Sequence, residues 1–329
     1  MSDHVLRIAD LHVEFKVFEG RLKVLNGIYM DVGPGARVGL VGEAGCGKTT
    51  MMRCILGILQ SPPGKITNGT ILFHDQNILK MSQANLQRMR GGGISMIFQD
   101  PVAALNPVFT VGDQLTSVIR YAATKKMDKK QIRRRAIKAL GDVQLPDPDR
   151  MFASYPVQLS GGMRQRVCIA MALATEPKLM IADEPTTALD VTIQAQVLRL
   201  LNALVEERST SVIFITHSLG VVKEMADWVY VMYAGNIVEG ATKEILFERP
   251  LHPYTRGLLG ALPKLTGGGM AEGIPGRIPD YLNPPTGCRF NPRCSRAMQM
   301  CSGDRPGLSE VGPDHRVACY LYGGDANVE

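Results

Sequence analysis

One segment of this sequence has the composition and spacing of a phosphate-binding loop. Residues 42–49 (GEAGCGKT) match the pattern G-x-x-x-x-G-K-[ST]. The glycines let backbone N–H groups turn toward phosphates, Lys48 supplies a positive charge, and the Thr49 hydroxyl can bind Mg²⁺. A strand-like run at 37–41 precedes the loop and a helical pattern at 49–59 follows it, as such loops require. The nucleotide-binding residues are therefore predicted to be Gly42, Gly45, Cys46, Gly47, Lys48, Thr49 and Thr50.

Two adjacent carboxylates follow a second apolar run, at 179–182. An acidic pair after a strand often only begins a loop. A triphosphate site, however, needs a metal ligand, and open parallel sheets present such groups at the carboxyl ends of their strands. We therefore expect Asp183 to hold Mg²⁺ and Glu184 to polarise the attacking water. Together with the phosphate loop, this pair predicts hydrolysis of a nucleoside triphosphate.

Strand-like and helical patterns alternate along most of the chain. Two alternating apolar and polar stretches, 5–15 and 22–32, are typical of an antiparallel hairpin that turns at Gly20. Further strands are expected at 71–73, 94–98, 212–216 and 229–233, and helices at 111–145, 161–175 and 193–204. The patterns predict an α/β fold with a mostly parallel core sheet, an antiparallel edge sheet and a helical subdomain at about residues 100–175.

Composition sets the limits of this interpretation. The chain has 329 residues, 45% of them hydrophobic, which is enough for one large or two medium domains. Its formal charge of +6 is spread along the sequence and argues neither for nor against nucleic acid. The opening does not resemble a signal peptide, and no apolar run approaches the ~20 residues of a membrane span. We therefore expect a cytoplasmic protein that reaches a membrane only through a partner.

The composition changes near residue 250. From there on, prolines and the glycine run at 267–269 are typical of irregular structure. The sequence therefore predicts a nucleotide-binding domain at 1–250 and an irregular C-terminal appendix at 251–329.

A third motif lies between the phosphate loop and the acidic pair. Residues 159–166 (LSGGMRQR) resemble the signature motif of ABC-type ATPases. A serine and two glycines at a helix start offer N–H donors and the positive end of the helix dipole to a γ-phosphate. Ser160, Gly161 and Gly162 alone could be a plain helix cap, but their position between the phosphate loop and the acidic pair favours the signature motif. The resemblance implies that two such domains meet head to tail, with ATP between Lys48 of one and Ser160 of the other.

The same resemblance assigns roles to three further residues. Gln99, after the strand at 94–98, is similar to the glutamine that senses Mg²⁺ and the γ-phosphate and faces the membrane subunit. Ala188-Leu189-Asp190 resembles the D-loop that crosses the dimer interface. His217 resembles the switch histidine that contacts the γ-phosphate. Catalysis is thus expected from Glu184 with His217 and Gln99.

Two details of the site stay open at the level of sequence. An aromatic residue upstream of the phosphate loop stacks on adenine in this family, and either Phe15 or Phe18 could do so. Ser218 follows His217 where the family commonly has aspartate, which leaves only the local support of His217 in doubt.

The sequences of other segments resemble one branch of the ABC-type ATPases, the ATPases of oligopeptide, dipeptide and nickel importers. Tyr155-Pro156, residues 183–196 (DEPTTALDVTIQAQ) and residues 252–255 (HPYT) carry this likeness, which covers nearly the whole chain. It implies a peripheral ATPase subunit at the cytoplasmic face of the inner membrane. The implied partners are two permeases, an extracytoplasmic binding protein and a second, similar ATPase in a heterodimer, with no nucleic acid. Peptides are the expected cargo; nickel, opines, sugars and a homodimer remain open.

Four of the seven cysteines lie in the appendix: Cys288, Cys294, Cys301 and Cys319. Little hydrophobic core is available there, so bound metal could compensate. The tight C-x₂₋₄-C pairs of zinc sites are absent, and the wider spacing favours an iron–sulfur cluster. The family resemblance implies a [4Fe-4S] cluster, with zinc or unmetallated thiols as alternatives. Arg289, Arg293 and Arg296 are expected to offset the thiolate charge.

The remaining cysteines have different expected roles. Cys54 and Cys168 lie within apolar helical patterns and should be core residues. Cys46 lies beside Lys48 at a helix start, which predicts a reactive thiol that bound nucleotide would shield.

Two competing classes fit the sequence less well. A soluble ABC ATPase of DNA repair or translation would usually show a long coiled-coil insertion or two cassettes, and this sequence has neither. A metal-sensing regulator with a degenerate ATPase would not need intact Lys48, Asp183, Glu184 and His217.

Overall fold

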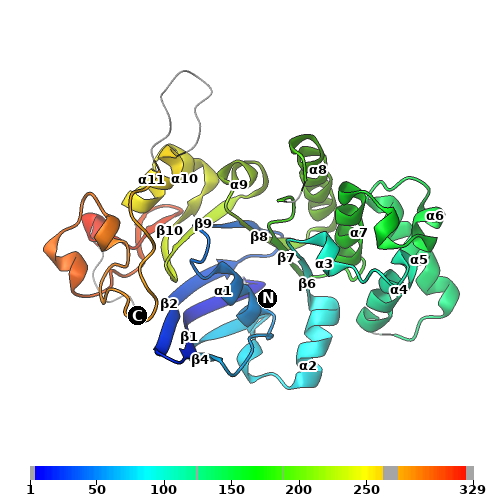
Figure 1. The fold of residues 1–329 in the computed structure, drawn as a ribbon, viewed down its shortest axis with the longest axis horizontal. Helices are drawn as coiled ribbons and strands as arrows, with labels where there is room; N and C mark the ends of the chain where they lie inside the picture. The colour runs from blue at the N-terminus through cyan, green and yellow to red at the C-terminus, as the bar shows by residue number, and fades with distance from the viewer. Residues whose placement is uncertain (1–3, 124, 188, 262–272, 324–329) are drawn as a thin grey trace. The chain divides into compact units, whose positions relative to one another are not determined.

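The computed structural model describes residues 4–123, 125–187, 189–261 and 273–323. Ala188 of the predicted D-loop and the glycine run at 267–269 lie outside these residues. The fold divides into two compact units (Figure 1). Unit 1 comprises Met1–Val5, Val32–Arg37 and Lys80–Ile215, and unit 2 comprises Leu6–Asp31, Val38–Leu79 and Thr216–Glu329.

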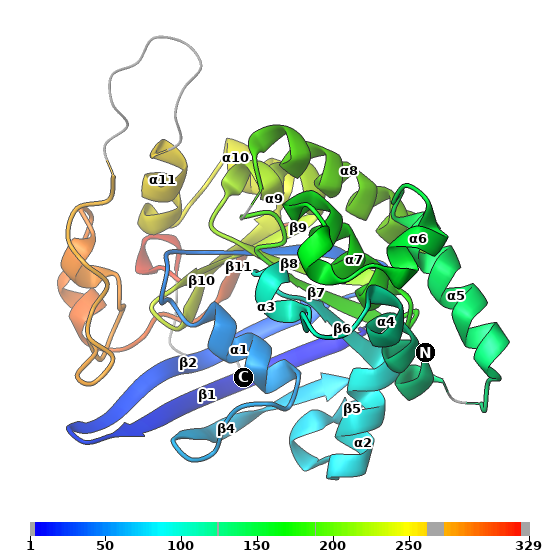
Figure 2. The same cartoon turned by 45° about the vertical axis from the view of Figure 1, so that its right-hand side comes forward.

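Unit 2 contains an antiparallel sheet with the strand order β2-β1-β4-β5. The strands are β1 (Leu6–Val17), β2 (Gly20–Val32), β4 (Gly64–Phe73) and β5 (Gln76–Asn77). Figure 2 shows β1, β2 and β4 side by side. Leu6 and Ile8 of β1 are buried, as are Leu11 and Val13, because alternate side chains of a strand share one face and the register shifts between the two pairs, where Asp10 has φ of 49°. The predicted hairpin is confirmed, and β4 is longer than the strand expected at 71–73.

A second set of strands in unit 2 begins with β3 (Arg37–Val41), which pairs in parallel with β9 (Trp228–Tyr233). β9 pairs antiparallel with β10 (Asn236–Thr242), and β10 with β12 (His315–Val317). β11 (Ser309–Gly312) completes the set beside β12. Part of the appendix therefore continues a regular sheet, although its composition suggested irregular structure throughout. The pairing was invisible in the sequence because β11 and β12 are short and rich in polar residues.

The helices of unit 2 include α1 (Lys48–Ile55), which begins within the phosphate loop. The others are α9 (Leu219–Met225), α10 (Lys243–Glu248) and α11 (Pro253–Gly260). The helix expected to reach residue 59 ends at Ile55, because Gly57 adopts a left-handed conformation with φ of 61° that a helix cannot continue through. Buried residues of α9, α10, α11 and Phe290 pack on β9 and β10 as one core cluster.

Unit 1 is built on the parallel strands β6 (Ile94–Ile97), β7 (Leu179–Asp183) and β8 (Ser211–Thr216). Its helices are α2 (Gln83–Arg88), α3 (Pro101–Ala104), α4 (Val111–Ala122), α5 (Lys129–Asp142), α6 (Pro148–Ala153), α7 (Gly161–Leu173) and α8 (Val191–Arg208). Figures 1 and 2 show α4, α5 and α6 gathered beside α7. The helical stretch expected at 111–145 is two helices, because Asp128 starts α5 with a reciprocal capping box.

Short helical turns complete the described chain: η1 (Ile78–Lys80), η2 (Met89–Gly93), η3 (Pro156–Gln158), η4 (Asn291–Arg293), η5 (Gln299–Ser302) and η6 (Tyr320–Tyr322). In the part of the chain that the structure describes, none of the helices combines the length and apolar character needed to cross a bilayer.

Candidate functional site

The phosphate loop lies between β3 and α1 in unit 2, and its lysine is held inside the loop. The Lys48 ammonium is buried and donates to the carbonyl oxygens of Gly42 at 2.7 Å and Glu43 at 2.9 Å. Gly47 adopts a φ of 110° just before the helix, and a Cβ on Gly42 would collide with the carbonyl of Met232. The loop therefore needs glycine at both positions, which is the reason the pattern was visible in the sequence.

Three appendix side chains hold this loop, and the sequence did not predict their role. The Glu43 N–H donates to the Tyr254 hydroxyl oxygen at 3.0 Å, and the Tyr281 hydroxyl donates to the Gly45 carbonyl at 2.7 Å. Arg293 pairs with the Glu43 carboxylate at 3.0 Å, and the Arg293 side chain is only 6% exposed. Tyr254 belongs to the HPYT segment, which in the sequence indicated only a resemblance to importer ATPases. Only that segment could have signalled the role.

Two of the three arginines expected beside the cysteines therefore act elsewhere. Arg293 pairs with Glu43, and Arg289 donates to the carbonyl of Ala234 at 2.5 Å. The prediction was wrong for these two because closeness in sequence does not fix where a long side chain ends. Arg296 does line the cysteine cavity, and its charge lowers the pKa of Cys294, against the larger raising effect of burial.

Cys46 is not the reactive thiol that the sequence suggested. Its side chain is fully buried, and this burial raises the pKa of the thiol, although the Lys48 ammonium lies 3.5 Å from Sγ and acts in the opposite direction. The prediction considered only the charge of Lys48 and missed the desolvation of the thiolate. Cys54 and Cys168 are buried, as expected, and burial raises the pKa of each to about 12.

Unit 1 brings the predicted water-activating carboxylate together with the predicted sensing glutamine. Glu184 follows β7 in a left-handed conformation with φ of 44°. Its Oε2 accepts hydrogen bonds from Gln99 Nε2 and from the Thr187 hydroxyl, both at 2.9 Å. These two donors fix the orientation of a half-buried carboxylate at the end of a parallel strand. Asp183, the predicted Mg²⁺ ligand, is the last residue of that strand.

The signature and the D-loop meet within unit 1. Ser160 caps α7 and accepts from the Met163 N–H at 3.3 Å, and Asp190 caps α8 by accepting from the Ile193 N–H at 3.0 Å. A Cβ on Gly162 would lie 2.8 Å from Ile193 Cγ2, so glycine permits the close approach of α7 and α8. Ser160 and Asp190 thus both serve as helix caps, in addition to any nucleotide contact they make.

The remaining predicted residues belong to unit 2. His217 is exposed at the end of β8. Ser218 caps α9 by accepting from the Val221 N–H at 3.4 Å, a task that serine and aspartate perform equally well. Phe15 is half-buried with its ring against Gly64, whereas Phe18 is fully exposed at the β1–β2 turn. Thr49 is exposed and Thr50 half-buried in the first turn of α1.

The four appendix cysteines line one small cavity of ≈ 10 Å³. Burial raises the pKa of Cys288 to about 11 and also raises those of Cys294 and Cys319. Neighbouring thiols add to this effect, since a thiolate disfavours a second one nearby. Among the described residues, no group of three or more His, Cys, Asp or Glu has the arrangement of a metal site. The thiols therefore converge, but their geometry is not that of a formed metal centre.

Comparisons with known proteins agree with these motifs. The family model "ABC transporter" matches residues 25–187, and the model "Oligopeptide/dipeptide transporter, C-terminal region" matches residues 238–301. The chain is 46% identical to the dipeptide transport ATP-binding protein DppD of Bacillus subtilis, over 97% of this chain and 95% of that protein. It is 43% identical to the oligopeptide transport ATP-binding protein OppD of Escherichia coli, over 97% and 94%.

A solved structure resembles the fold. It is the dimeric post-hydrolysis state of the ATP-binding cassette MJ0796 bound to ADP and Pi, with 26% sequence identity and a TM-score of 0.65. The likeness covers 72% of this chain and 98% of that one.

Proposed function

This chain belongs to the ABC transporter family, among the ATP-binding subunits of oligopeptide and dipeptide transporters, and from that premise we propose which residues run its ATPase cycle. It is an ATPase coupled to transport. The contact that carries the proposal is the 2.9 Å hydrogen bond from Gln99 to Glu184. It joins the carboxylate proposed to activate water to the glutamine proposed to face the permease.

Different residues are proposed to bind the phosphates, hold Mg²⁺, activate water and contact adenine. The loop glycines and Lys48 bind the β- and γ-phosphates, and Thr49, Asp183 and Gln99 are the proposed Mg²⁺ ligands. Glu184 takes a proton from water as the water oxygen attacks the γ-phosphorus and the bond to the bridging oxygen of ADP breaks. His217 stabilises the charge that develops on the γ-phosphate. Phe15 or Phe18 stacks on adenine.

ATP binding is proposed to close a dimer. Ser160, Gly161 and Gly162 at the start of α7 offer N–H groups to the γ-phosphate bound by the opposite subunit, and Asp190 crosses the interface. The dimeric cassette MJ0796 supports this arrangement. We propose a second, similar ATPase as the partner. The ATPase dimer is proposed to lie at the cytoplasmic face of the inner membrane. Its closure would change the conformation of two permeases, which receive cargo from an extracytoplasmic binding protein.

Peptides are the proposed cargo, because the C-terminal family model and the relatives named above are those of oligopeptide and dipeptide transporters. In a strain that lacks this gene, we expect uptake of labelled di- and oligopeptides to fall at least tenfold. The wild-type gene should restore uptake and the Lys48→Ala variant should not, because the loop then loses its charge for the phosphates. Loss of nickel, opine or sugar uptake with peptide uptake intact would contradict the cargo and leave the ATPase assignment standing.

The cysteine cavity is the proposed site of a [4Fe-4S] cluster, with Cys288, Cys294, Cys301 and Cys319 as ligands. Their convergence on one cavity supports the proposal. Ligation would require the thiols to lose their protons and to move into metal-binding geometry. Anaerobically purified protein should contain iron and acid-labile sulfide in equal amounts, and Cys301→Ser should lose both. Zinc without sulfide, or neither metal, would exclude the cluster.

A further inference from the structure

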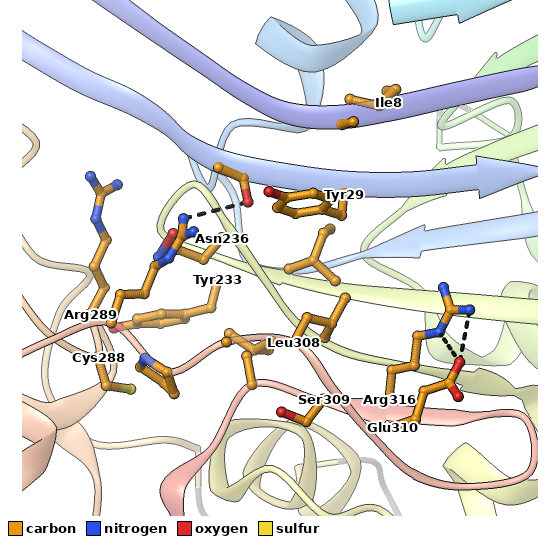
Figure 3. Close-up of a pocket in the computed structure, with 18 of the residues that line it drawn as sticks. Ile8, Tyr29, Tyr233, Asn236, Cys288, Arg289, Leu308, Ser309, Glu310 and Arg316 are labelled. Carbon is orange, nitrogen blue, oxygen red and sulfur yellow. Dashed lines mark hydrogen bonds and ion pairs between the residues drawn. The ribbon is translucent and has the colours of Figure 1, made fainter. Parts of the chain in front are cut away.

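Unit 2 contains a pocket of ≈ 790 Å³ that lies apart from the phosphate loop and shares Cys288 with the cysteine cavity. Figure 3 shows its walls: Ile8 of β1, Tyr29 of β2, Asn236 of β10, and Leu308 with Ser309 from the appendix. None of residues 42–49 lines it. Its volume lies within the range of about 300–1,000 Å³ that is typical of small-molecule sites.

The charges that line this pocket do not balance. Four arginines and two carboxylates line it: Arg7, Arg289, Arg305, Arg316, Asp31 and Glu310. Both carboxylates are paired with arginines. Arg7 pairs with Asp31 at 3.1 Å, and Arg316 pairs with Glu310 at 3.1 Å. Two of the four positive charges are therefore left without a carboxylate partner among the side chains that the structure describes.

Those two charges belong to Arg289 and Arg305. Arg289 is 3% exposed and donates to the Ala234 carbonyl, while its Nε has no hydrogen-bond partner. Arg305 donates to the carbonyls of Asn26 and Gly27. Neither has a carboxylate partner within the described residues. A buried guanidinium is costly unless an anion pairs with it.

Two glycines leave space for these guanidinium groups. A Cβ on Gly27 would collide with the Arg305 guanidinium, and a Cβ on Gly235 would lie 2.9 Å from Arg289 NH1. Both glycines also adopt positive φ, 68° and 79°, which other residues adopt rarely. Glycine leaves room for the two guanidinium groups, and their hydrogen bonds to the carbonyls of residues 26, 27 and 234 restrain them, so little side-chain entropy is lost when an anion binds.

We propose that this pocket binds a small phosphate monoester. The dianion is held between Arg289 and Arg305, because guanidinium groups match phosphate oxygens in geometry and two of them match its charge. The organic part of the ester lies against the Tyr29 ring and the apolar wall formed by Ile8 and Leu308. The inference is independent of the identity of the transported cargo.

Phenyl phosphate is a suitable probe for this site. Titration of the full chain should be done with saturating Mg-ADP, so that the phosphate loop is occupied. We expect saturable binding of phenyl phosphate, detected by calorimetry, and no binding of phenol. Arg305→Gln should weaken the affinity at least tenfold, since a charge-assisted hydrogen bond is lost. Arg277→Gln, which removes an exposed arginine outside the pocket, should leave it unchanged.

Three results would overturn the proposal. One is the absence of saturable binding to the wild-type chain. Another is equal affinity in the Arg305→Gln and Arg277→Gln variants, both verified as folded by their retained affinity for ADP. The third is inorganic phosphate binding as tightly as phenyl phosphate, which would leave no role for the organic part. Arg289→Gln removes the second guanidinium of the proposed site. The folded variant should also bind phenyl phosphate more weakly than the wild-type chain.

Discussion

Replacement of Glu184 by glutamine is expected to abolish most ATP turnover while ATP still binds. The amide keeps the size of the side chain and can still contact Gln99 and Thr187, which now donate to Oε2 at 2.9 Å. It cannot take a proton from water, so turnover should fall by about 10²–10⁴-fold, the usual contribution of a general base. Steady-state ATP hydrolysis and equilibrium ATP binding, measured on the same preparation, check both parts of this result.

The Glu184→Gln variant should also reveal the proposed dimer, because ATP that is bound but not hydrolysed keeps the closed state populated. Sedimentation with Mg-ATP, in the presence of the natural partner subunit where one is required, should show association that Mg-ADP does not support. Glu207→Gln on the exposed face of α8 is a matched control and should hydrolyse ATP at the wild-type rate. Undiminished turnover in Glu184→Gln would show that another group activates the water.

The phosphate loop, the acidic strand and the parallel strands could be predicted because each depends on local sequence. Gly42 and Gly47 are required by backbone geometry within a few residues of Lys48, so a short pattern identifies them. The strands β7 and β8 are apolar runs bounded by polar residues, and their lengths matched expectation within a residue or two.

The support of that loop could not be predicted, because it comes from residues about 210 to 250 positions away along the chain. Tyr254 and Arg293 carry no pattern that points to Glu43, and long side chains such as Arg293 reach partners that only the tertiary fold determines. The prediction that Cys46 is reactive was wrong for a similar reason. The sequence displays the neighbouring charge of Lys48, but the burial that opposes it depends on the packed core.

The pair formed by Arg293 and Glu43 predicts a large loss of stability when only one partner is removed. Arg293 donates to both oxygens of Glu43, and its other nitrogens donate to the carbonyls of Pro275 at 2.8 Å and Ile274 at 3.1 Å. Arg293→Met fills similar volume but leaves the carboxylate and two carbonyls unpaired. Because the Glu43 side chain is 28% exposed, the cost should lie near the lower end for buried pairs, about 3 kcal/mol.

Chemical denaturation followed by a probe in unit 2 measures this loss, and nucleotide affinity should fall with it because Glu43 is part of the phosphate loop. Adding Glu43→Gln to Arg293→Met should recover part of the stability, since no unpaired carboxylate is left behind. Arg21→Met breaks an exposed pair with Glu14, in which the Arg21 side chain is 66% exposed, and should cost at most about 1 kcal/mol. Equal losses in Arg293→Met and Arg21→Met would mean that the appendix does not stabilise the phosphate loop through this pair.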